Sequence, residues 1–160
     1  MGKQNNFNNI VSFMNNIQKS ELINRLVSFV CHDTILYLPE NQTAKKYLVS
    51  ANAFLGTHFQ MCDTFATDDV NVLQKDKIDV YLNKLNTSNL VGLYLVATEL
   101  RSVLLAILLK EKEISIEEAF ACSFAEELTE QKKWGTLDEI KQRHLEVIEH
   151  LREAEKVINA

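Results

Sequence analysis

The stretch from Asn89 to Lys110 is apolar on nearly every side, and it constrains the fold more than any other part of the sequence. Strands are rarely this long, so the stretch predicts a helix. A helix that is hydrophobic all round must be buried, either in a protein core or in lipid. Because Glu99 and Arg101 lie at its middle, where isolated charges are costly in a bilayer, we expect a central core helix around which the other elements pack.

The remaining segments are predicted to be mainly helical as well. One proline and four glycines among 160 residues leave few positions at which helices must end. Ser115 with Glu118, and Thr136 with Glu139, have the spacing of capping boxes at the start of two helices. Apolar side chains recur at three- and four-residue spacing in residues 5–18, 20–30, 41–54, 72–85, 115–134 and 136–158.

The last predicted helix has a narrow apolar seam on an otherwise charged surface. We therefore expect it to lie on the outside of the domain with one stripe docked, and His144 to be a satisfied histidine at that boundary. The seam consists of Leu137, Ile140, His144, Val147, Leu151, Ala154 and Ile158.

Two short segments predict strands. The run from Asp33 to Leu38 is β-branched and aromatic and stops at Pro39, and the run from Thr57 to Ala66 is similar. With the helix at residues 41–54 between them, they suggest a small parallel βαβ unit. The expected fold is therefore mostly α, one helical domain over residues 1–160 around one buried central helix, with a small two-stranded βαβ element.

Composition argues against several functions. The net charge is −5 and no Lys/Arg cluster stands out, so we expect no nucleic-acid partner. The three cysteines are odd in number and far apart, which favours reduced thiols in a cytosol-like compartment. The N-terminal residues have neither an apolar signal core nor an Arg-rich transit pattern. These features indicate a cytoplasmic protein without membrane insertion.

No catalytic motif stands out. The sequence lacks a Gly-rich phosphate loop, a Gly-x-Ser-x-Gly turn, a His-Glu-x-x-His pair and a Cys-x-x-Cys pair. We therefore expect no enzyme activity, no cofactor, no metal and no small-molecule substrate. Cys31, His32 and Cys62 could approach one another, but their spacing supplies no recognisable metal-ligand set. A small enzyme that uses these Cys and His side chains remains an alternative.

Glu127 interrupts the apolar side of the predicted helix 115–134. At about 100° per residue, it falls among the apolar residues Ile116, Phe120, Phe124, Leu128 and Trp134. Glu126 and Glu130 flank it. A carboxylate on an apolar stripe is either paired or functional, because burying it alone is costly. Two interpretations stay open: an ion pair with a basic residue such as Arg101, or a carboxylate that faces a partner or ligand.

Three segments resemble one known family, the ATP synthase F-one assembly chaperones. Leu100-Arg101-Ser102, followed by aliphatic residues, is similar to their long helix, and Asp33–Tyr37 looks like their Asp-Thr strand. The glutamate-rich segment that ends in Trp134-Gly135 looks like their acidic segment. The family is F-one complex assembly factor 2, the Atp-twelve type, and the chain resembles an alphaproteobacterial member from about Phe7 to its C-terminus.

The resemblance implies a non-enzymatic chaperone. Members bind the free α subunit of the catalytic head and keep it from aggregating until it pairs with β. An acidic residue before the Trp-Gly pair is important for this, and Glu126 and Glu127 match it; with Glu130 and Trp134 they are the expected partner-binding residues. Members work in the bacterial cytoplasm or the mitochondrial matrix. They usually carry an N-terminal β-rich domain, which we expect to be absent here. A generic helical adaptor is the alternative among binding proteins.

Overall fold

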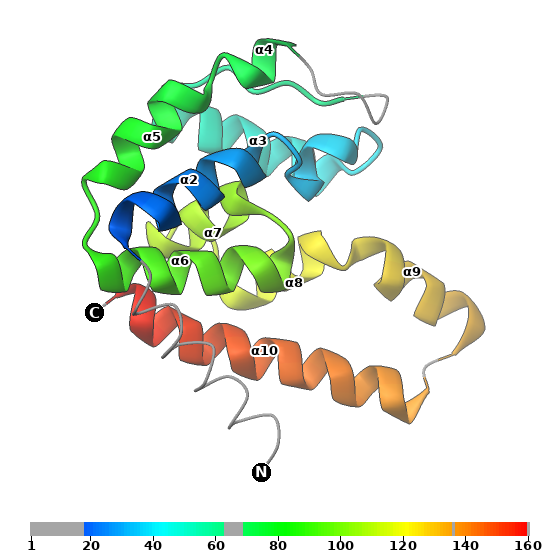
Figure 1. Cartoon of the computed structure of the whole chain (residues 1–160). Helices are drawn as coiled ribbons and strands as arrows, with labels where there is room; N and C mark the ends of the chain where they lie inside the picture. The colour runs from blue at the N-terminus through cyan, green and yellow to red at the C-terminus, as the bar shows by residue number, and fades with distance from the viewer. Residues whose placement is uncertain (1–17, 63–68, 136, 160) are drawn as a thin grey trace.

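The computed structural model describes residues 18–62, 69–135 and 137–159, and of Trp134 only the backbone. The described chain is mostly helical, as predicted (Figure 1). Its elements are α2 (Lys19–Val30), the 3-10 helix η1 (Thr34–Tyr37), α3 (Gln42–Leu55), α4 (Asp69–Val72), α5 (Lys75–Asn83), α6 (Thr87–Leu100), α7 (Val103–Lys110), α8 (Ile116–Ser123), α9 (Ala125–Trp134) and α10 (Asp138–Ile158). Residues 5–17 of the helix predicted at 5–18 and the capping residue Thr136 lie outside the described residues.

The core is built around α6 and α7. Every residue of α7 from Val103 to Leu109 is buried, and α6 is buried on most of its surface. α2, α3 and α5 lie on one side of this pair and α10 on the other (Figure 1). Gly92 allows α10 to approach α6 closely, because an added Cβ would lie 2.4 Å from the backbone nitrogen of Ile158. The expected buried centre is therefore confirmed.

The prediction of one uninterrupted helix at 89–110 is wrong. Arg101 adopts a left-handed conformation with φ of 57°, which ends α6. Ser102 then caps α7, because its hydroxyl oxygen accepts the backbone N–H of Leu105 at 3.0 Å. A left-handed residue costs roughly 1–2 kcal/mol, and the capping bonds offset that cost. Hydrophobic periodicity cannot reveal the break, since both helices are apolar on all sides.

The two-stranded βαβ element is also wrong, because the described residues contain no strand. Residues 34–37 form η1, since the Asp33 carboxylate accepts the backbone N–H of Ile35 at 3.2 Å and caps the turn. Residues 57–62 have no partner strand. One backbone hydrogen bond, from the Cys62 N–H to the Leu36 carbonyl at 2.6 Å, joins the two segments. Side chains satisfy much of the remaining backbone, with the amide oxygens of Gln74 and Asn71 accepting N–H groups at 2.9 and 2.7 Å. Residues 63–66 of the second predicted strand lie outside the described part.

The helix predicted at 115–134 divides at Phe124 into α8 and α9. Its start is as predicted: the Ser115 hydroxyl accepts the Glu118 N–H at 3.1 Å, and the Glu118 carboxylate accepts the Ser115 N–H at 3.0 Å. At the end of α8, the Ser123 hydroxyl donates to the Leu100 carbonyl at 2.6 Å. The bend keeps Ser123 and Phe124 buried while α9 departs from the core with no buried residue among its described side chains.

The seam of α10 is docked over only part of its length. His144, Leu151, Ala154 and Ile158 are buried, but Leu137 is 67% exposed. Figure 1 shows the reason: the first turns of α10 extend, together with α9, beyond the helical body. The seam prediction therefore holds from His144 onward.

Candidate partner-binding surface

The sequence segments behind the family resemblance meet at the break between α6 and α7. The Thr34 N–H donates to the Arg101 carbonyl at 3.0 Å, and the Leu104 N–H donates to the Asp33 carboxylate at 2.9 Å. The Asp33 carboxylate thus accepts N–H groups from the first turns of both η1 and α7, where the helix dipole favours a negative charge. This contact fixes the position of Arg101.

Asp33 is completely buried. Burial raises the pKa of its carboxyl group to about 6, although the hydrogen bonds from Leu104, Ser102 and Ile35 oppose this rise. The group is inaccessible to a partner, so we assign it a structural role. Its function is to hold the start of α7 and, through it, the left-handed turn from which the Arg101 side chain projects toward α9.

The acidic segment forms the first turns of α9. Glu126, Glu127 and Glu130 are all exposed. One oxygen of Glu127 lies 3.5 Å from a guanidinium nitrogen of Arg101, and the other lies 3.3 Å from Nε2 of His144. The predicted pairing with Arg101 is therefore present. The helical projection also implied that this pair is buried, and that is wrong, because the side chains of Glu127 and Arg101 are 49% and 54% exposed. An exposed pair of this kind contributes roughly 0–1 kcal/mol.

His144 is the contact that the sequence did not reveal. Its ring is buried against Phe120 and Phe124, with centroid distances of 5.2 and 5.6 Å. Its Nδ1 lies 3.3 Å from the Gln131 amide nitrogen, so α10 holds α9 through Glu127 and Gln131. The break at Phe124 turns Glu127 toward α10, and a projection of one straight helix could not have shown this.

Open space borders α9 on two sides. A hollow of about 750 Å³ lies between residues 37–42 and the face of α9 that carries Ala125, Glu126 and Glu130. A second hollow of about 420 Å³ lies between α9 and the first turns of α10, and Glu130 lines this one too. Trp134 ends α9, but its side chain is outside the described part. α9 therefore presents three carboxylates on a helix whose flanks are accessible.

The residues of the enzyme alternative do not form a reactive group. Cys31 and Cys62 are buried, whereas His32 is exposed. Burial raises the pKa of the Cys31 thiol, which disfavours the thiolate needed for nucleophilic attack. Among the described residues, no three His, Cys, Asp or Glu side chains are grouped so that they could hold a metal ion. None of the helices in the described segments has the length and apolar character needed to cross a bilayer.

No family model and no curated protein sequence matches this chain. Solved structures do match it. Atp12 from Paracoccus denitrificans superposes with a TM-score of 0.75 and 18% identity over 88% of this chain and 65% of that one. A mutant of the same protein superposes with a TM-score of 0.75 and 16% identity, over 87% of this chain and 63% of that one. Atu1473, a candidate chaperone from Agrobacterium tumefaciens, superposes with a TM-score of 0.74 and 20% identity, over 88% of this chain and 56% of that one.

These likenesses show that the described chain shares its helical architecture with solved bacterial proteins, one of them a candidate chaperone. More specifically, the described chain has the fold of Atp12, and the resemblance to the Atp-twelve type is confirmed at the level of the fold. The chain covers less than two thirds of the length of each matched structure.

Proposed function

We propose that this protein is an assembly chaperone without catalytic activity that binds the free α subunit of the ATP synthase catalytic head. It would keep that subunit from aggregating until it pairs with β, in the bacterial cytoplasm or the mitochondrial matrix. The observation that carries the proposal is α9: on an Atp12 fold, the acidic segment is an exposed helix with no buried residue among its described side chains. A helix in that position contributes little to the core, which favours a role in recognition.

The chemistry of α9 suits a basic surface on the partner. Glu127 already contacts the Arg101 guanidinium and the His144 ring, which indicates that its carboxylate can accept hydrogen bonds from two directions. Glu126 and Glu130 border the larger hollow on the other flank. Arg or Lys side chains of the α subunit would pair with these groups, and such charge complementarity sets association rate and specificity more than affinity. Trp134 is the proposed apolar contact at the end of the same helix.

The direct test is suppression of α-subunit aggregation, measured by light scattering during dilution from denaturant. The parent protein should suppress it and should co-purify with α when β is absent. Glu126→Gln, Glu127→Gln and Glu130→Gln keep side-chain shape and remove charge, and at least one of them should lose protection while remaining folded by circular dichroism.

The matched control is Glu117→Gln on α8, since Glu117 is an exposed glutamate paired with Arg152 at 2.9 Å. It removes the same charge away from α9 and should protect as well as the parent. Equal protection by the triple variant Glu126→Gln, Glu127→Gln, Glu130→Gln would exclude the acidic helix as the binding surface. Capture of other proteins in place of α would instead support a generic adaptor.

A further inference from the structure

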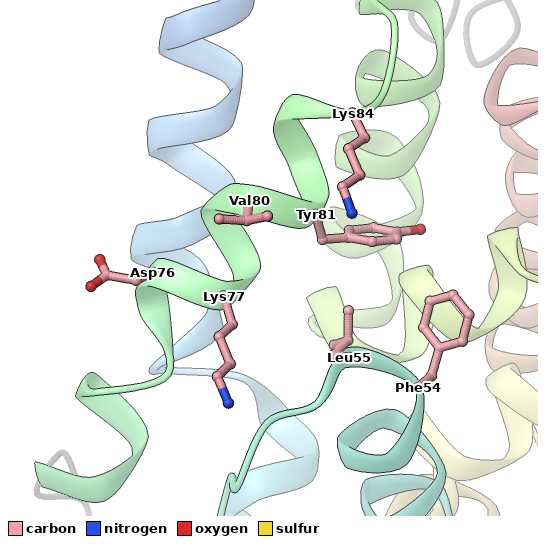
Figure 2. A pocket seen from close by; sticks show the side chains of 7 residues that line it. All are labelled: Phe54, Leu55, Asp76, Lys77, Val80, Tyr81 and Lys84. Carbon is pink, nitrogen blue, oxygen red and sulfur yellow. The ribbon is translucent and has the colours of Figure 1, made fainter.

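A second surface lies between α3 and α5. A hollow of about 480 Å³ is lined by Phe54, Leu55, Asp76, Lys77, Val80, Tyr81 and Lys84 (Figure 2). In Figure 1, α5 lies at the upper left and α9 at the right, so this groove and the acidic helix belong to different parts of the molecule. None of these groove residues takes part in the function proposed above.

The groove exposes more apolar surface than packing explains. Phe54 is 44% exposed and Val80 is 58% exposed, although α5 buries Ile78 and Leu82 completely on its inner side. Of the large apolar side chains that are exposed in the described chain, Phe54 and Val80 line this groove from opposite sides, together with Leu55 and the ring of Tyr81. Exposed apolar groups that line one groove mark surfaces that bind other proteins.

The floor of the groove is held in a fixed shape. The Tyr81 hydroxyl donates to the Glu111 carboxylate at 2.5 Å, and its ring meets Phe54 edge to face with centroids 6.0 Å apart. Burial, together with this carboxylate, raises the pKa of Tyr81, so the hydroxyl remains a donor. Gly56, with φ of 68°, ends α3 directly after the groove residues Phe54 and Leu55. The apolar floor therefore exists before any partner arrives.

Two lysines and one aspartate line the groove, so its lining has a net positive charge although the chain as a whole is negative. Lys77 on α5 and Lys84, the residue that caps the end of α5, are exposed and seven residues apart, so they lie on the same side about 10 Å apart along the axis. Figure 2 shows Lys84 beside Tyr81 and Lys77 near the chain that follows Leu55, while Asp76 points away. Lys77 donates to the Gly56 carbonyl, and among the described residues neither ammonium forms an ion pair with a carboxylate.

From this combination we infer that the groove between α3 and α5 docks an amphipathic helical segment of a partner protein whose apolar stripe is flanked by carboxylates. The apolar side chains of the segment cover Phe54 and Val80, and carboxylates about two turns apart pair with Lys77 and Lys84. Docking of an amphipathic helix in an apolar groove is a recurrent mode of peptide recognition. The two lysines select for acidic segments and against basic ones.

The test uses the full chain and synthetic helical peptides labelled with a fluorophore, with binding followed by fluorescence anisotropy. The first peptide carries leucines at three- and four-residue spacing and two glutamates seven residues apart beside that stripe. The second has lysine in place of both glutamates, and the third has glutamine in place of the leucines. The parent protein should bind the first peptide. Its affinity for each of the other two peptides should be lower by about tenfold or more.

Two variants separate the apolar and the charged contributions. Val80→Gln and the pair Lys77→Glu with Lys84→Glu change exposed side chains, so both should fold, and each should weaken binding of the glutamate peptide about tenfold. The charge-reversed pair should prefer the lysine peptide. The control pair Lys132→Glu with Lys133→Glu makes the same change in net charge on α9 and should bind like the parent.

The inference is overturned if the parent does not bind the glutamate peptide, or if the groove variants bind it as well as the parent does. It is also overturned if sedimentation shows a dimer of the parent that Val80→Gln dissociates, because a second copy would then occupy the groove. The experiment contains no α subunit, so its failure leaves the chaperone proposal untouched.

Discussion

Asp33→Asn should remove one defined part of the pH dependence of stability. The buried Asp33 carboxylate accepts backbone N–H groups from Ile35 and Leu104. Burial raises the pKa of the carboxyl group from 3.8 to about 6. Because one pKa unit corresponds to about 1.4 kcal/mol, ionisation of Asp33 lowers the free energy of unfolding by roughly 3 kcal/mol at neutral pH relative to acid.

The sign follows from proton binding. Between about pH 4 and pH 6 the folded protein holds the Asp33 proton more tightly than the unfolded chain does. The free energy of unfolding contributed by this group therefore falls as the pH rises through that window. Glu118 acts in the opposite direction, because hydrogen bonds from Ser115 lower the pKa of its carboxyl group. Both proteins contain Glu118, so the difference between parent and variant isolates Asp33.

Urea unfolding between about pH 4 and pH 7.5 measures the effect. The stability of the parent relative to Asp33→Asn should fall by roughly 2.5 kcal/mol across this range, because a small part of the effect is already present at pH 4. The amide also presents a donor where the carboxylate accepts two N–H groups, which costs about 1–3 kcal/mol at every pH. The exposed Asp138 provides a control, and Asp138→Asn should keep the fall in stability that Asp33→Asn removes. Parallel profiles for the parent and Asp33→Asn would refute the reasoning.

Three further substitutions test the packing and the site. Leu104→Ala empties a completely buried position and should lower the free energy of unfolding by about 2–5 kcal/mol, whereas Leu145→Ala at an exposed position should change it by less than about 0.5 kcal/mol in the same urea titration. Gly92→Ala places a Cβ against Ile158 and should lower the melting temperature, with an unchanged value showing that α10 can shift freely. Glu127→Gln should lower stability by less than about 1 kcal/mol, because its ion pairs are half exposed; a larger loss in denaturant unfolding would contradict a surface role.

Local sequence rules predicted much of the fold but not its breaks. Ser115 and Glu118 form their capping box because both partners lie within one turn, and the apolar run at 89–110 is buried because no other environment accepts it. The left-handed turn at Arg101 depends on Asp33, which is distant in sequence and caps the next helix. The same carboxylate converts an expected strand into η1. These outcomes are set by tertiary hydrogen bonds, which periodicity does not contain.

The site was predictable in its composition and not in its geometry. The position of Glu127 on an apolar stripe suggested an ion pair with Arg101, and that contact exists. The second contact of Glu127, with His144, requires both the bend at Phe124 and the path of α10. Whether Glu126, Glu127, Glu130 and Trp134 bind a partner stays a prediction.

The absence of buried side chains among the described residues of α9 bears on how this helix moves. Leu128, which is partly buried, packs against the core from α9. Detaching the helix therefore exposes limited apolar surface, so it should open locally at a fraction of the global unfolding free energy. Amide hydrogens of α9 should exchange with solvent long before those of α7, which is buried along its length. A partner that binds α9 must halt this opening, which lowers affinity, yet the same freedom lets one acidic helix adjust its orientation to the surface it meets.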